Sequence, residues 1–408
     1  MELRPILSAM RRNKVGAIVI AVQMAVTLAI LCNGLFIIQQ RVALSKRPTG
    51  ADESSVFVIT NQWVGNPTDL VPRLQADLAA MRSVPGVVDA FATNSFPLSD
   101  GGSTEGVKLN ADQKESTASA ALYMGDEHAI NSLGLKLIAG RNFNSDEVLN
   151  KMGFTDQVSP NAVIITKVLA EKLYPGGNAL GKTIYAQYQK KQVPIIGIID
   201  KLQVPWVSAA GWGSKFNDNS MLEPFLYATQ FSFYIVRSQP GQMNAVIKAV
   251  EKKLIDVNRA RVLDKTQSLT TARAEVYKDD RGLAVILGVV CIALLAVTAF
   301  GIVGLTSYWV AQRRRQIGIR RALGATRNAI VQYFQTENLL IAGAGALIGV
   351  ALAVSLNLWM VTAFSMERLH VGYAVIGAIV VLLLGQAAVL WPALKAAAIP
   401  PALASRGA

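Results

Sequence analysis

The stretch VGAIVIAVQMAVTLAILCNGLFII, Val15 to Ile38, carries no charged residue. As a helix rising about 1.5 Å per residue, it is long enough to cross the roughly 30 Å apolar core of a bilayer. A cleaved signal peptide is the alternative for such a run near the N-terminus. Signal peptides have apolar regions of only about 7–15 residues and end in a small-residue cleavage site, which this run lacks. We therefore predict a retained membrane anchor.

Three more charge-free apolar runs occur in the C-terminal part of the chain. One uncharged run could be a buried core helix, but four of this length predict an integral membrane α-helical protein. The predicted transmembrane helices cover residues 15–40, 282–312, 338–366 including an external end, and 373–394.

Charged residues flank these runs unevenly. Four basic residues precede the first run against one acidic residue, and six arginines lie between the second and third runs. The positive-inside rule therefore assigns both segments to the cytoplasm. The predicted cytoplasmic segments are residues 1–14, 313–337 and 395–408, and the predicted external segments are residues 41–281 and 367–372.

The external stretch of residues 41–281 is long enough to bury a hydrophobic core of its own. It holds most of the acidic residues and is nearly neutral, whereas the whole chain has a net charge of +13. The excess charge therefore reflects membrane orientation, and we predict no nucleic-acid binding.

Cysteine and histidine are rare in this chain. Cys32 and Cys291 fall within predicted membrane helices, so neither can form a disulfide in the external stretch. His128 and His370 are far apart in sequence and have no partner motif. We predict no metal site and no catalytic residues.

Two strand–helix patterns lie near the two ends of the external stretch. SSVFVIT (Ser54–Thr60) and FSFYIVR (Phe231–Arg237) are apolar and β-branched or aromatic, as strands are, and each precedes a helical pattern. They bracket a middle section of about 120 residues. The prediction is a large α+β domain of two lobes, the second inserted into the first, placed between membrane helices one and two.

The stretch GGNALGKT matches the phosphate-binding P-loop pattern, with Gly176, Gly181, Lys182 and Thr183 at its fixed positions. A working P-loop follows a strand and opens a helix, so that backbone N–H groups meet the phosphates. Here the preceding VLAEKLY is helical in composition, and the following TIYAQYQ alternates like a strand. We interpret the match as an external turn that binds no nucleotide.

The basic segment RRRQIGIRRALGATRN begins at Arg313, and its order of residues carries more information than its positive charge alone. Its order of residues resembles that of the FtsX-like/MacB-type permeases of ABC transporters, which have I-G-I-R-[RK]-A-[LI]-G-A here. GLKLIAGRNF (Gly134–Phe143), ITKVLAEKLYPGGNALGKTI (Ile165–Ile184) and IIGIID (Ile195–Asp200) are similar to landmarks of the family's periplasmic core domain. WPALKAAAIPPALASR (Trp391–Arg406) is similar to its C-terminal ending.

The resemblance implies a bacterial inner-membrane permease subunit without a fused ATPase domain. Its large domain would be periplasmic and both termini cytoplasmic. It implies a separate cytoplasmic ATPase subunit that binds ATP and Mg, with no cofactor in this chain itself. It further implies a dimer with a second copy or a sister permease. A periplasmic adaptor, an outer-membrane channel and membrane lipids are further expected partners.

The resemblance also implies an ATPase-coupling segment in the loop after the second membrane helix. Gln316 departs from the family there, because a glutamate is common at this place. Gly318 and Gly324 would allow close backbone approach, and Arg320 and Arg321 would either pair with acidic groups of the ATPase or anchor the segment at the membrane face. The predicted coupling residues are Arg315, Gln316, Ile317, Gly318, Ile319, Arg320, Arg321, Ala322, Leu323, Gly324 and Ala325.

Two further sets of residues are candidates for contacts. Gln23 and Thr27 share one face of the first membrane helix, and Gly345 with Gly349 forms a G-x-x-x-G pair in the third, so both sets could lie between helices. In the external stretch, three aromatic residues in a Gly/Ser-rich loop either contact a partner or fold back onto their own domain. These residues are Trp206, Trp212 and Phe216.

Two functions are compatible with this sequence. The first is efflux or extraction of a hydrophobic compound, a peptide or a lipoprotein from the periplasmic side. The alternative is a mechanotransmitting regulator of an external cell-wall hydrolase or envelope signalling complex. The large external domain favours the first.

Overall fold

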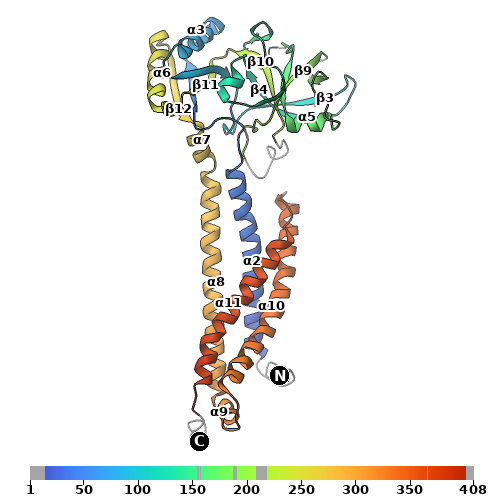
Figure 1. The fold of residues 1–408 in the computed structure, drawn as a ribbon, viewed down its shortest axis with the longest axis vertical. Coiled ribbons are helices and arrows are strands. Elements are labelled where there is room, and N and C mark those ends of the chain that lie inside the picture. The colour runs from blue at the N-terminus through green and yellow to red at the C-terminus, as the bar shows by residue number, and fades with distance from the viewer. Residues whose placement is uncertain are drawn as a thin grey trace. The chain divides into compact units, whose positions relative to one another are not determined.

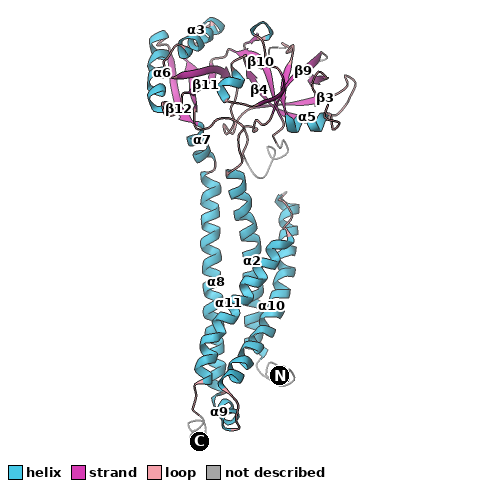
Figure 2. Cartoon of the chain, viewed as in Figure 1, coloured by secondary structure: helices cyan, strands magenta, loops and turns pink. Residues whose placement is uncertain are grey.

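The computed structural model describes residues 14–153, 156, 158–186, 191–207, 218–364 and 366–400. The chain divides into two compact units (Figure 1). One unit is the continuous stretch Leu44–Asp279, and the other combines the chain before residue 44 with the chain from Asp280 onward. All strands of the described chain belong to the Leu44–Asp279 unit (Figure 2).

The other unit is helical and confirms the prediction of four membrane-spanning helices. At about 1.5 Å per residue each is longer than the roughly 30 Å apolar core, so their ends extend beyond it. A short helix, α9, connects the second long helix with the third. The helices are α2 (Lys14–Ser45), α8 (Lys278–Gln312), α9 (Arg314–Ala322), α10 (Arg327–Phe364) and α11 (Val371–Ala397).

Helix α10 begins at Arg327, well before the charge-free run at residue 338. The additional turns are amphipathic. Ile330 and Phe334 are buried against the helical bundle, and the charged residue Glu337 is buried beside them. The third membrane helix and the helical pattern that precedes it in the sequence are therefore one continuous helix.

The first lobe of the Leu44–Asp279 unit is a four-stranded antiparallel sheet with strand order β12-β1-β11-β2. In chain order its elements alternate as β-α-β and β-α-β, which is the ferredoxin-like arrangement. The elements are β1 (Val56–Trp63), α3 (Leu70–Arg82), β2 (Val87–Thr93), β11 (Phe231–Ser238), α6 (Met243–Val257) and β12 (Arg261–Ser268), followed by α7 (Leu269–Val276).

The second lobe is inserted between β2 and β11, which confirms the predicted two-lobed domain. Its strand pairings close on themselves, because β4 pairs with β3 on one side and with β10 on the other. The elements are β3 (Ser103–Lys108), β4 (Ala118–Gly125), α4 (Ala129–Leu133), β5 (Leu137–Gly140), a 3-10 turn (Ser145–Glu147), β6 (Leu149–Lys151), β7 (Val163–Thr166), α5 (Lys167–Leu173), β8 (Thr183–Ala186), β9 (Gln192–Ile199) and β10 (Ser220–Tyr227).

Strand β1 of the first lobe is buried on both faces along most of its length. Phe57 and Ile59 of β1 pack under helices α3 and α6, which lie side by side on one face of the sheet (Figure 1). Val56 and Val58 point to the other face and join a core that includes Tyr123 of the second lobe. Successive side chains of a strand alternate between faces, so one apolar run serves both cores.

A buried ion pair joins the helical and strand layers of the first lobe. The Arg261 guanidinium donates to both Asp77 carboxylate oxygens at 2.7 Å, and both side chains are fully buried. The Tyr234 hydroxyl donates to the same carboxylate at 2.7 Å, and Trp63 packs on the guanidinium with its ring centroid 4.2 Å away. Burial and the Asp77 charge raise the pKa of Tyr234 well above its usual value, so it remains a donor.

We expect Asp77→Asn to lower the free energy of unfolding of the Leu44–Asp279 unit by about 3–5 kcal/mol, because it leaves the Arg261 charge buried without its counter-ion. Urea-dependent pulse proteolysis of the full chain measures this change. The control is Glu275→Gln, which breaks the exposed Lys265–Glu275 pair and should cost no more than about 1 kcal/mol. Equal losses for the two variants would contradict a structural role for the buried pair.

Candidate functional site

Helix α9 follows α8 after a single intervening residue, Arg313. The backbone hydrogen bonds continue through this residue, from the Arg313 N–H to Trp309 O and from the Ile317 N–H to Arg313 O, each 3.0 Å long. The Arg313 side chain donates from Nη1 to both carboxylate oxygens of Glu337, at 2.8 and 3.1 Å. Both side chains are largely buried, so this ion pair fixes the α8–α9 junction to α10.

Helix α9 ends in a Schellman motif. The Ala325 N–H donates to Arg320 O at 3.0 Å, and the Gly324 N–H donates to Arg321 O at 3.2 Å. Gly324 has φ +97°, a left-handed conformation that glycine adopts at little cost. No described atom lies within 4 Å of a Cβ built there, so within this chain the glycine is needed for its backbone angle and not for close approach.

The two adjacent arginines of α9 have different environments. Arg321 is half-buried and donates from Nη1 to the carbonyls of Ala397 and Ile399, at 2.9 and 2.8 Å. A cation there satisfies carbonyls that the end of α11 leaves without helical partners. Arg320 is exposed, and its guanidinium lies 5.0 Å from the Tyr333 ring centroid. Arg321 therefore binds backbone carbonyls of its own chain through Nη1, and pairing of either arginine with acidic groups of an ATPase stays a prediction.

The remaining residues of the predicted coupling segment divide by burial. Ile317 and Gly318 are buried against the bundle, and Ala325 is half-buried. The side chains of Ile319 and Leu323 are instead 51% and 84% exposed and lie four residues apart on one face. Around them the exposed residues are Arg315, Gln316, Arg320 and Ala322.

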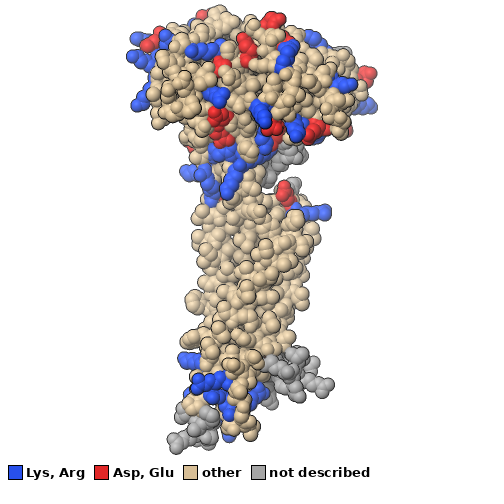
Figure 3. Space-filling model, in the orientation of Figure 1, with Lys and Arg blue, Asp and Glu red and all other residues tan. Residues whose placement is uncertain are grey.

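Basic side chains gather at the end of the helical unit that holds α9. Figure 3 shows this cluster beyond a broad band of the bundle surface that displays no charged side chain. An exposed apolar pair surrounded by cations, on a helix tied to α10 and α11, is suited to bind an acidic surface that has a groove.

The four residues predicted to lie between membrane helices all take part in contacts between α2 and a neighbouring helix. Gln23 Nε2 donates to Val297 O at 3.1 Å, and the Thr27 and Thr298 hydroxyls are 2.8 Å apart, so both link α2 to α8. A Cβ built on Gly345 or Gly349 would lie 2.7 or 2.9 Å from backbone oxygens of α2. These glycines of α10 therefore admit the α2 backbone at close range.

The P-loop-like stretch lies between helix α5 and strand β8, the reverse of the order that a phosphate site requires. Three of its backbone N–H groups donate to carbonyls of this chain. The Gly177 N–H donates to Tyr174 O at 3.0 Å, the Gly181 N–H to Ile195 O at 2.9 Å and the Lys182 N–H to Ala179 O at 3.1 Å. Gly176 and Thr183 belong to the same turn and strand.

The predicted external contact residues are only partly described. Trp206 is half-buried and packs against the core shared by the two lobes. Trp212 and Phe216 lie outside the described residues. Among the described residues, no three His, Cys, Asp or Glu side chains gather in a way that could hold a metal ion.

Sequence reasoning missed the Arg313–Glu337 pair and the contact of Arg321 with the end of α11. The first had a signal, since Glu337 is the one acidic residue between the second and third apolar runs. The second involves backbone carbonyls, which no side-chain pattern indicates.

Two family models match this chain. Residues 15–253 match the MacB-like periplasmic core domain, and residues 288–401 match the FtsX-like permease C-terminal domain. The first match alone covers more than half of the chain.

Several curated relatives are similar over most of the chain. "Macrolide export ATP-binding/permease protein MacB" of Neisseria meningitidis is 26% identical over 326 residues, which are 76% of this chain and 46% of the relative. "Uncharacterized ABC transporter permease YknZ" of Bacillus subtilis is 22% identical over 335 residues, covering 81% and 78%. The chain spans about half the length of the MacB relatives that it matches.

Two solved structures are similar to part of the chain. The extracellular domain of YknZ from Gram-positive bacteria has a TM-score of 0.33 at 18% identity, covering 52% of this chain and 98% of that one. The periplasmic region of MacB from Actinobacillus actinomycetemcomitans has a TM-score of 0.33 at 16% identity, covering 57% and 97%. With both family models matched in order along one chain of four membrane helices, this protein belongs to the FtsX-like/MacB-type permeases of ABC transporters.

Proposed function

We propose that this chain is a permease subunit that couples ATP hydrolysis by a separate cytoplasmic ATPase subunit to movement of its periplasmic domain. The ATPase would bind ATP and Mg, and α9 would be its docking site. The cargo class that we propose is a hydrophobic compound, a peptide or a lipoprotein taken from the periplasmic side. The observation that carries the proposal is the exposed Ile319–Leu323 pair on a helix that this chain holds in place.

The way α9 is held supports a role in force transmission. Arg313 ties its start to Glu337 of α10, and Arg321 ties its end to the carbonyls of Ala397 and Ile399 at the end of α11. A push on α9 would therefore reach three long helices, since α8 is also nearly continuous with it. Motion transmitted in this way requires a second arrangement of the helices that nucleotide-bound ATPase favours.

Orientation and assembly follow from the same proposal. The basic cluster around α9 supports a cytoplasmic location for that end of the bundle and for both termini. Only 11% of the residues in the apolar stretch of α8 are buried in this chain, against 44% in that of α2. Most of the apolar surface of α8 is therefore left to lipid or to a second permease. We propose a dimer through this surface, with a periplasmic adaptor and an outer-membrane channel as further partners.

We expect the double change Ile319→Ser with Leu323→Ser to weaken ATPase binding by about tenfold or more, since burying one such side chain contributes roughly 1.5–3 kcal/mol. Each candidate ATPase is co-expressed with the tagged full chain. For the ATPase that co-purifies, the Kd of its complex with the unmodified chain and with each variant is then measured. The matched control is Val257→Ser with Val262→Ser, two exposed apolar residues outside α9. Unchanged binding in the α9 variant would move the docking site elsewhere, and recovery of no ATPase from any encoded candidate would contradict the proposed function itself.

Lys182→Ala with Thr183→Ala should leave ATP hydrolysis by the assembled complex within about twofold of the unmodified rate. The physical reason is that three of the loop's backbone N–H groups are already bonded within the chain and that a strand follows it instead of a helix. Steady-state phosphate release by the purified complex measures the rate. A collapse of hydrolysis in a complex that still assembles would show that this loop binds nucleotide after all.

A further inference from the structure

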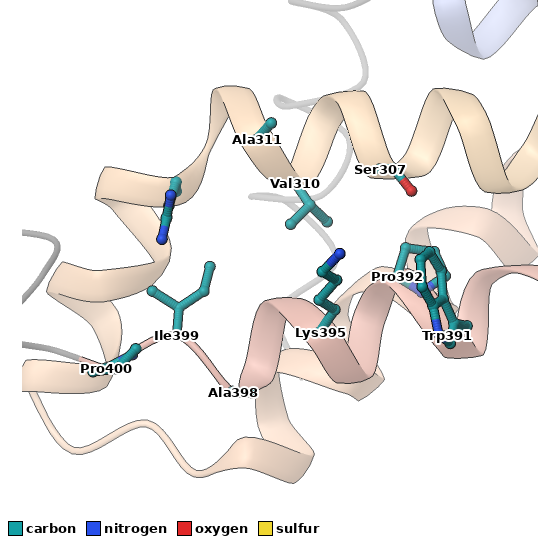
Figure 4. A pocket seen from close by; sticks show the side chains of 10 residues that line it. Ser307, Val310, Ala311, Trp391, Pro392, Lys395, Ala398, Ile399 and Pro400 are labelled. Carbon is teal, nitrogen blue, oxygen red and sulfur yellow. The ribbon is translucent and has the colours of Figure 1, made fainter.

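A cavity of about 510 Å³ lies between the ends of α8 and α11 that are nearest to α9. Figure 4 shows Ser307, Val310 and Ala311 of α8 on one side of it. Trp391 and Lys395 of α11 lie on the other side, and the Lys395 amino group points toward α8. All of these residues belong to the helical unit.

Two cations line this cavity and no acidic residue does. Arg314, the first residue of α9, and Lys395 are both exposed, and neither forms an ion pair with a carboxylate of the described chain. Lys395 is positioned by Trp391, whose ring centroid lies 5.1 Å from the ammonium nitrogen. The Ser307 hydroxyl adds a polar group to the α8 wall. The cavity therefore offers positive charge and hydrogen-bond donors to an anion.

The rest of the lining is apolar. Val310 and Pro392 form part of the walls, and Trp391 is 60% exposed at the rim. The cavity lies where the charge-free run of α8, residues 282–312, gives way to the arginines that begin at Arg313, which is the level of lipid headgroups. A phospholipid places a phosphate and an acyl chain side by side at that level, so it satisfies both the cations and the apolar walls.

We propose that this cavity binds the headgroup of an anionic phospholipid from the membrane leaflet that contains α9. The phosphate contacts Arg314 and Lys395, and the first part of an acyl chain packs on Val310, Trp391 and Pro392. Basic pockets between membrane helices are suited to anionic lipids. The bound lipid connects α8, α9 and α11 at the point where Arg313 fixes the junction. This inference requires only that the helices span a membrane and holds whether or not an ATPase docks on α9.

Native mass spectrometry of the full chain in detergent tests the proposal. The chain is offered equal amounts of phosphatidylglycerol and phosphatidylcholine with identical acyl chains, and the bound fraction of each is measured. We expect preferential retention of phosphatidylglycerol. Arg314→Gln with Lys395→Gln should weaken its binding by about 100-fold, on the basis of roughly tenfold for each direct contact between a cation and the phosphate.

The control removes two cations from the same end of the bundle but outside the cavity. Arg315→Gln with Arg327→Gln changes two exposed arginines that do not line the cavity, and it should weaken lipid retention far less than the cavity variant because neither side chain contacts the phosphate. Equal losses in the two double variants would assign the effect to diffuse charge and overturn the site, as would full retention in the Arg314/Lys395 variant.

A competition with glycerol 3-phosphate distinguishes a lipid from a free phosphate. Displacement of phosphatidylglycerol by millimolar glycerol 3-phosphate would assign the cavity to a water-soluble anion and overturn the lipid proposal. We expect no displacement, because the soluble anion makes no contact with the apolar walls. Trp391→Ala should reduce lipid retention, and unchanged retention would contradict the proposed acyl-chain contact.

Discussion

Membrane helices gain little from burying apolar surface against one another, because lipid is as apolar as their side chains. Close packing of backbones must hold this bundle together, and the approach of α10 and α11 to α2 provides it. A Cβ on Gly345 would lie 2.7 Å from the Ala21 carbonyl oxygen, and a Cβ on Gly377 of α11 would lie 2.6 Å from the Cys32 sulfur. Met24 of α2 is fully buried as a result. The third neighbour, α8, is joined to α2 through the Thr27–Thr298 hydroxyl pair.

This arrangement explains what the coupling segment can do. Helix α9 has nine residues, too few to be stable alone in water, so its position depends on its attachments. Its attachments reach α10 through Glu337 and the end of α11 through Arg321. Because α10 and α11 both pack on α2, the small helix is joined to the whole bundle. The exposed Ile319 and Leu323 therefore lie on a helix whose position is fixed by the other helices.

Local pattern predicted much of this fold. The charge-free runs predicted the four long helices, and apolar stretches rich in β-branched or aromatic residues predicted β1 and β11, each followed by a helical pattern that became α3 or α6. The neighbours of GGNALGKT also predicted the observed order of helix, turn and strand. These features depend on residues close together in sequence, where periodicity and turn chemistry are sufficient.

Tertiary contacts could not be predicted in the same way. Arg320 and Arg321 are identical in type and adjacent, yet one lies over an aromatic ring and the other binds the carbonyls of Ala397 and Ile399, 76 and 78 residues away. The buried Asp77–Arg261 pair spans 184 residues. Such pairs are decided by how the elements pack, and a single sequence contains no periodic signal for them.

The interrupted order of the ferredoxin-like lobe has a consequence for biosynthesis. Strand β1 pairs only with β11 and β12 within the described sheet, and its first residue, Val56, lies opposite Arg237. At about 5–20 residues per second, synthesis of the intervening chain takes on the order of 10–40 s. During that time β1 has left the ribosome with both edges unpaired, and an exposed apolar strand is prone to aggregate. The inserted second lobe does not shorten this interval, because its strand β10 (Ser220–Tyr227) is made just before β11 begins at Phe231.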